Sequence, residues 1–164
     1  VLLEVGGFHP DGMPDEFLKY RGDGESAVSR GILDAGYKTF FNPKASIYHF
    51  VPTKRMTPDY IHKRGYIQGI SDSYTSIRRD RRVNPKTTMR MSMSGLIHRL
   101  KMRVKNFINT EMRPQDYYRS GWLKGYLYHQ HEVLKDEMLL AWILKDNYFG
   151  ENGEIPKKSP QNLK

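Results

Sequence analysis

The pattern of apolar and polar positions changes within residues 22–49. In the first part of this stretch apolar residues recur at helical spacing, which predicts a short helix that stops at Gly36. Residues 37–41 and 45–50 are short runs of β-forming side chains, separated by an Asn-Pro turn signal. We therefore expect an acidic loop, one short helix and two strands here.

Helical spacing returns further along the chain. It predicts a helix from about residue 57 to residue 79, with Thr57 as its N-cap and a proline at its first position. Residues 79–94 are polar and basic and include Asn84-Pro85, so we expect an exposed connector there. A second helix is expected over about residues 94–109, with apolar side chains on one side and basic side chains off it.

Pro114 opens a third, long helix that we expect to reach about residue 148. Gly121 and Gly125 lie four residues apart on it. They indicate either a close contact with another helix or a break of this helix into two pieces. From residue 150 onward the chain lacks apolar bulk, so residues 150–164 are expected to be a disordered tail.

The composition limits the classes of protein that fit. With 164 residues, of which 38% are apolar, the chain has room for one core of ordinary size. It has no cysteine, which excludes disulfides and thiolate zinc sites, and no apolar run long enough to span a membrane. The first residues do not resemble a signal peptide, so we expect a protein that is cytoplasmic or peripheral to a membrane. The sequence also does not begin with Met, so we expect it to be a piece of a longer chain.

Basic residues are concentrated in residues 78–105. This segment has ten Arg or Lys and one acid, so its charge is 10 − 1 = +9, which equals the net charge of the whole chain. The rest of the sequence is neutral by the same count. A segment of this kind predicts an anionic partner or a solvated surface.

Two acids precede the short helix, and each has two interpretations. Asp23 and Glu25 are suited to capping a helix or lying in its dipole, which is worth about 1 kcal/mol, or to acting as a general base. His49 could be a hydrogen-bonded imidazole at a strand end or a metal ligand, although one His does not make a metal site. Arg64 fits phosphate oxygens, or an ion pair with Asp59 on the surface.

Five short motifs follow one another in the first half of the chain. They are Gly6-Gly7-Phe8, Gly22-Asp23-Gly24-Glu25, Ala35-Gly36-Tyr37, Asn42-Pro43 through Ile47-Tyr48-His49, and Arg64 with Gly69-Ile70-Ser71. In this order, residues 1–79 resemble the C-terminal, acceptor-side part of family 2 glycosyltransferases of the GT-A fold. The resemblance implies an α/β fragment: a small αββ portion of a GT-A fold, then a mainly α-helical extension with its basic connector over residues 80–149.

The resemblance also implies roles for individual residues. It makes Glu25 the first choice for the general base of an inverting transfer and Asp23 the second, while His49 would lie on the metal side of the donor diphosphate. The metal would be Mg²⁺ or Mn²⁺, with its main ligands outside this chain. The residues that would contact the donor diphosphate or the acceptor are Gly6, Gly7, Phe8 and Arg64.

The resemblance implies partners as well. The donor would be a nucleotide sugar and the acceptor a glycan or a lipid-linked hydroxyl compound, at the inner face of a membrane. No Asp-X-Asp metal motif occurs in the sequence. We therefore expect the nucleotide-binding half to lie upstream in the same protein, and this chain to be inactive alone.

The basic segment supports a different class of function, a non-catalytic binding module. Nucleic acid would suit the charge, but no helix-turn-helix, zinc or RNA-binding signature accompanies it. An anionic membrane surface would suit the apolar stripe and flanking basic residues of the helix at 94–109. The alternative is that this stripe packs on the long C-terminal helix and the charges are solvated.

Overall fold

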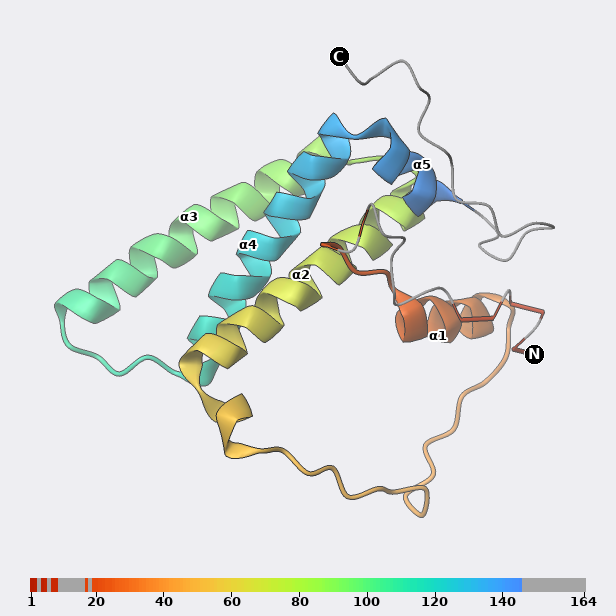
Figure 1. Cartoon of the computed structure of the whole chain (residues 1–164), viewed down its shortest axis with the longest axis horizontal. Helices are drawn as coiled ribbons and strands as arrows, with labels where there is room; N and C mark the ends of the chain where they lie inside the picture. The colour runs from red at the N-terminus through yellow and green to blue at the C-terminus, as the bar shows by residue number, and fades with distance from the viewer. Residues whose placement is uncertain (3, 6, 9–16, 18, 146–164) are drawn as a thin grey trace.

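The computed structural model describes the chain except residues 3, 6, 9–16, 18 and 146–164. The described part contains five α-helices and one 3₁₀ turn. Their bounds are α1 Gly24–Asp34, the 3₁₀ turn η2 Thr53–Met56, α2 Pro58–Asp80, α3 Pro85–Phe107, α4 Pro114–Lys135 and α5 Glu137–Leu144. Figure 1 shows α2, α4 and α3 side by side, with α4 in the middle and α1 on the far side of α2.

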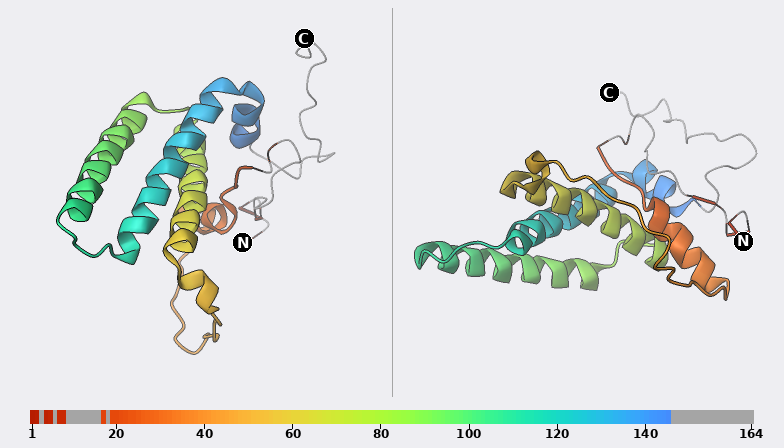
Figure 2. Two further views of the ribbon diagram at one scale, coloured as in Figure 1. Left: turned by 60° about the vertical axis from the view of Figure 1, so that its left-hand side comes forward. Right: turned by 90° about the horizontal axis from the view of Figure 1, so that it is seen from below.

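The closest contact in the fold is the crossing of α2 and α4. Gly65 and Gly69 on α2 lie against the backbone of α4, and Gly121 and Gly125 on α4 lie against the backbone of α2. A Cβ at any of these four positions would overlap a carbonyl oxygen of the opposite helix, so only glycine allows this approach. The two views of Figure 2 show the crossing from other sides.

The core lies where α5 folds back over the ends of α2 and α4. Its buried side chains come from these three helices and from the segment before α1. Arg78, near the end of α2, donates hydrogen bonds from one guanidinium nitrogen to the carbonyl oxygens of Ile143 (2.9 Å) and Lys145 (2.7 Å). The largest buried members of this core are Phe17, Tyr20, Ile70, Tyr74, Ile77, Val133, Leu139, Trp142 and Ile143.

A buried polar cluster joins α2, α3 and α4. His129 Nδ1 lies 2.8 Å from Ser73 Oγ, and Gln130 donates a hydrogen bond of 2.8 Å to the same oxygen. Thr88 on α3 donates to the side-chain oxygen of Gln130 at 3.1 Å. His129 is fully buried, and burial lowers its pKa to about 3, so its imidazole is neutral.

The expected α/β fold class is wrong. No strand occurs in the described residues, and the two expected strands at 37–41 and 45–50 lie in an irregular segment between α1 and η2. Their large side chains are exposed: Phe40, Phe41, Ile47, Tyr48 and Phe50 are all at least 84% accessible. A single strand leaves its backbone groups and its apolar face unsatisfied, and no other segment in the described part of the chain pairs with this one.

Several helix predictions are confirmed and two need correction. α2 begins at the expected place, with Thr57 Oγ1 accepting from the backbone N–H of Tyr60 at 3.3 Å. The expected connector at 79–94 is mostly helix, because Asn84 caps α3 and Pro85 occupies its first turn. The third helix is interrupted at Asp136, whose carboxylate caps α5 through the N–H groups of Met138 and Leu139.

The glycines of the third helix mark a close contact with α2 and not a break. This contact joins α2 and α4, which lie on opposite sides of the domain division expected at residue 79. The domain division itself remains a prediction. The expected disordered tail lies outside the described residues. Among the helices that are described, none combines the length and apolarity needed to cross a bilayer.

Candidate functional site

A polar hollow lies between the start of α1 and the middle of α2. It has a volume of about 370 Å³. The loop before α1 forms one wall, and one face of α2 forms the other. The lining residues are Arg21, Gly22, Asp23, Glu25, Ser26, Arg64, Ile67, Gln68 and Ser71.

Helical spacing explains why α2 presents a polar wall. Arg64, Gln68 and Ser71 lie at i, i+4 and i+7, so they share one side of the helix. Ser71 Oγ donates a hydrogen bond of 2.9 Å to the carbonyl oxygen of Gly22, which ties the acidic loop to α2. The hollow is therefore held at a fixed width at this end.

The amide of Gln68 is held by a second chain of hydrogen bonds. Its nitrogen donates to Asp72 Oδ1 at 2.9 Å, and the other oxygen of Asp72 accepts from the indole N–H of Trp122 at 2.6 Å. Trp122 belongs to α4, so the orientation of this amide is set by the α2–α4 crossing. A wall residue fixed in this way is preorganised for hydrogen bonding with a ligand.

The two acids of the hollow have different surroundings. Glu25 lies in the first turn of α1, where the helix dipole favours a negative charge, and its side chain is exposed. Asp23 occupies the N-cap position of α1, but its side chain makes no capping hydrogen bond and is only 4% accessible. Of the two carboxylates, Glu25 is therefore the one that a molecule from solvent can reach.

Asp23 also borders a second hollow of about 430 Å³ on the other side of the loop. Four arginines line that hollow: Arg30, Arg78, Arg79 and Arg81. Arg78 is engaged by the α5 carbonyl oxygens described above, and Arg79 pairs with Asp80 at 2.9 Å. Asp23 thus lies between a mixed polar hollow and an arginine-rich hollow that Asp34 also lines.

The other sequence-predicted site residues do not join this hollow. Gly7 has a positive φ of 69°, Phe8 is 51% accessible, and neither lines the hollow; Gly6 lies outside the described residues. His49 is exposed in the irregular segment after α1. The hollow brings together Glu25, Asp23 and Arg64 only.

His49 does not form a divalent-metal site with other described residues. The described residues include no group of three His, Asp or Glu side chains that could hold a metal ion. A single imidazole does not fit Mg²⁺ or Mn²⁺, which prefer several oxygen ligands.

Sequence reasoning missed three lining residues: Arg21, Ser26 and Ile67. A signal for Ile67 was present, because it falls within the i, i+3, i+4, i+7 set that begins at Arg64. Arg21 directly precedes the acidic loop, but nothing in the sequence shows that the loop folds against α2. Spatial placement of that loop depends on packing between segments about 45 residues apart.

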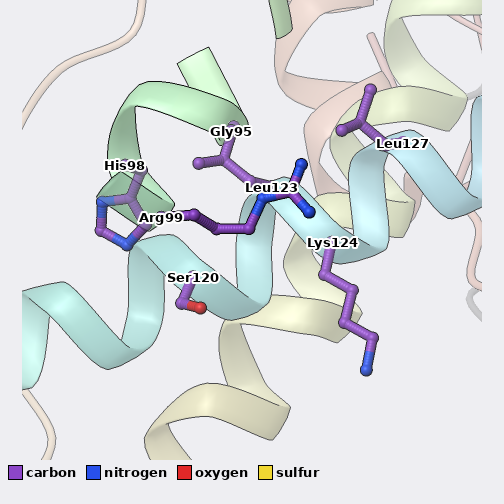
Figure 3. A pocket seen from close by; sticks show the side chains of 7 residues that line it. All are labelled: Gly95, His98, Arg99, Ser120, Leu123, Lys124 and Leu127. Atoms are coloured by element: carbon purple, nitrogen blue, oxygen red, sulfur yellow. The ribbon is translucent and has the colours of Figure 1, made fainter. Parts of the chain in front are cut away.

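A third cavity, of about 360 Å³, lies between α3 and α4, and Figure 3 shows the seven residues that line it. His98 is buried there, and burial lowers the pKa of its imidazole, against the opposing effect of a hydrogen bond with the backbone of Asp116. Its Nε2 atom is buried without a hydrogen-bond partner. Leu123 and Leu127 make this cavity less suited to a polar ligand than the hollow beside Glu25.

No protein-family model, curated protein or solved structure matches this chain. The described residues form helices and irregular segments but no strand, so the αββ portion that the resemblance to GT-A enzymes implied is missing. The assignment to that family is therefore wrong, because no family model matches the chain and the expected strands are missing from the described residues.

Proposed function

We propose that this chain supplies the acceptor side of a nucleotide-sugar-dependent glycosyltransferase, with Glu25 as the general base. The proposal depends mainly on one observation, the convergence of Glu25, Asp23 and Arg64 on a single polar hollow. The sequence alone indicates the same three residues as candidate site residues. The donor's nucleotide is assigned to an upstream part of the same protein.

The walls of the hollow suit an acceptor with several hydroxyl groups. Carboxylates accept hydrogen bonds from hydroxyls, guanidinium groups donate to them, and amides and hydroxyls do both. All four chemical types line this hollow. An acceptor sugar bound here would be oriented by several polar contacts at once.

The proposed reaction is a displacement at the anomeric carbon of the donor sugar. Glu25 takes the proton from an acceptor hydroxyl as the hydroxyl oxygen forms its bond to that carbon. The bond from the same carbon to the diphosphate oxygen breaks, and the nucleoside diphosphate leaves with the electron pair. A base of this kind contributes on the order of 10²–10⁴ in rate.

Acceptor binding can be tested without a donor. Saturation-transfer NMR with a panel of mono- and oligosaccharides is expected to identify a ligand of the 164-residue chain. Arg64→Ala is expected to weaken this binding by roughly 10- to 100-fold, because a hydrogen bond from a charged donor is worth roughly 1.5–3 kcal/mol.

The matched control is Lys63→Ala, which removes a neighbouring exposed cation of α2 that does not line the hollow. It is expected to leave saccharide binding unchanged. Equal losses in the two variants, or no saccharide binding by the unmodified chain, would contradict an acceptor site in this hollow.

A further inference from the structure

The outer face of α3 is apolar, and none of the other described helices packs against it. Eight apolar side chains of α3 and the residue after it are between 52% and 89% accessible. At 100° per residue they fall within an arc of roughly 120°. They are Met89, Met93, Leu96, Ile97, Leu100, Val104, Phe107 and Ile108.

The opposite face of α3 makes its contacts with the rest of the protein. Gly95 and His98 are the buried residues of this helix, and both line the cavity against α4. Arg119 of α4 donates to Ser94 Oγ at 3.0 Å, and Lys105 pairs with Asp116. These contacts fix the rotation of α3 about its axis, so the apolar stripe faces away from α4.

Basic side chains border the stripe on both sides. Arg99 and Arg103 lie along one edge, and Arg90 and Lys101 lie along the other. All four are exposed. α3 contains no Asp or Glu. Cations therefore border the stripe, and α3 itself has no acidic side chain that could neutralise them.

We propose that α3 docks lengthwise on an anionic lipid bilayer. Its 23 residues form a rod of about 35 Å, whose apolar stripe enters the boundary between headgroups and acyl chains while the flanking cations meet anionic headgroups. Charge favours this occupant over a second copy of the chain, because two such faces would bring eight cations together.

The position of α3 at one side of the molecule makes this docking possible. Both views of Figure 2 place α3 at the periphery, with α4 between it and α2. Arg99, whose side chain is drawn in Figure 3, extends from the edge of the stripe next to α4. The polar hollow beside Glu25 lies on α1 and α2, so binding at α3 leaves it open.

Co-sedimentation of the full chain with vesicles tests the proposal. Binding is expected to phosphatidylcholine vesicles that contain phosphatidylglycerol, and to weaken as salt shortens the Debye length from about 10 Å at 0.1 M to about 3 Å at 1 M. Lys101→Gln and Arg103→Gln are each expected to lower the partition coefficient about fivefold. Equal binding to pure phosphatidylcholine would overturn the electrostatic part of the proposal.

The apolar part is tested by the double variant Leu100→Glu/Phe107→Glu. Partitioning onto anionic vesicles is expected to fall by more than about tenfold, because two apolar anchors are lost and two negative charges added. The matched control is Leu134→Glu, which changes an exposed leucine of α4 outside the stripe. Its partition coefficient is expected to fall at most about fivefold, which is the effect of adding one negative charge. Circular dichroism checks that each variant keeps its helices.

Two other occupants would appear as distinct results. A dimer of the chain in sedimentation without lipid, abolished by Leu100→Glu/Phe107→Glu, would assign the stripe to self-association and overturn the proposal. Tight binding to duplex DNA that survives this double variant, with no binding to vesicles, would overturn it in favour of a nucleic acid.

Discussion

At the scale of single residues, burial separates two acids that suit a helix start equally well. Asp23 and Glu25 are two positions apart in an acidic loop, and both suit the start of a helix. The structure covers Asp23 and leaves Glu25 exposed in the first turn of α1. Helix-start chemistry could not distinguish them, and only the family resemblance ranked Glu25 first, because which acid is covered depends on how the loop packs against other helices.

His129 makes the stability of the protein depend on pH. Its pKa is lowered by burial to about 3, below the ordinary value of 6.5, so the unfolded chain binds a proton more readily than the folded one. The stabilisation is complete above pH 6.5 and is lost as pH falls towards 3. Between pH 7 and pH 5 this group alone is expected to lower the free energy of unfolding by about 2 kcal/mol.

Urea unfolding at pH 7 and pH 5 measures this loss. In His129→Gln the difference between the two pH values is expected to shrink. His131→Gln serves as the control because His131 is exposed, and it is expected to keep the full difference. An unchanged pH difference in His129→Gln would show that another group is responsible.

At the scale of elements, capping chemistry was the most reliable signal. Thr57 before Pro58 predicted the start of α2, and Pro114 predicted the start of α4. The prediction from the same chemistry is wrong at Asn84-Pro85. This pair predicts an exposed break in the chain, but in the structure it begins α3. An Asn-Pro pair ends one segment and begins the next, so local sequence does not decide which role it has.

The two expected strands failed for a reason that is not local. Residues 37–41 and 45–50 have the side chains of strands, but a strand also needs a partner for its backbone hydrogen bonds. The described residues offer none. Composition indicates only the local preference of a segment, and it could not predict that this segment has no strand to pair with.

The α2–α4 crossing predicts an unusually large effect of one methyl group. Gly69→Ala or Gly125→Ala would place a Cβ against the carbonyl oxygen of Trp122 or Tyr66, which belong to the facing backbone. Each is expected to destabilise the protein by about 3 kcal/mol, because the helices must move apart. The midpoint of urea unfolding measures the change.

Gly95→Ala is the matched control for these variants. Its Cβ would lie 3.8 Å from the nearest atom, Leu127 Cδ1, which is ordinary contact distance. Since alanine favours a helix over glycine, this variant is expected to stabilise the protein by about 0.5–1 kcal/mol. A loss of stability in Gly95→Ala equal to that in Gly69→Ala would contradict the crossing.

At the scale of the whole molecule, the two proposed surfaces lie on different helices. The polar hollow is built by α1 and α2, and the apolar stripe belongs to α3. The amphipathic character of residues 94–109 was predictable from spacing alone. Which side of that helix faces α4 was not, because it is fixed by contacts such as the hydrogen bond of Arg119 with Ser94.

Part of the hollow was predictable in the same sense. Helical spacing put Arg64, Gln68 and Ser71 on one face of α2, and the acids were evident beside α1. Their meeting depends on the hydrogen bond from Ser71 to Gly22, which joins residues 49 positions apart. His49 was expected near the same site and is exposed elsewhere, because the strand that would have positioned it does not form.

The proposed role of Glu25 as general base is tested most directly by turnover of a protein that joins this chain to the proposed upstream donor-binding part. With a nucleotide sugar and a saccharide acceptor, Glu25→Gln is expected to lower kcat by about 10²–10⁴ and to leave the KM for the acceptor nearly unchanged. Asp34→Asn, which removes another exposed acid of α1 away from the hollow, is expected to keep normal turnover. Near-normal turnover in Glu25→Gln would contradict the account.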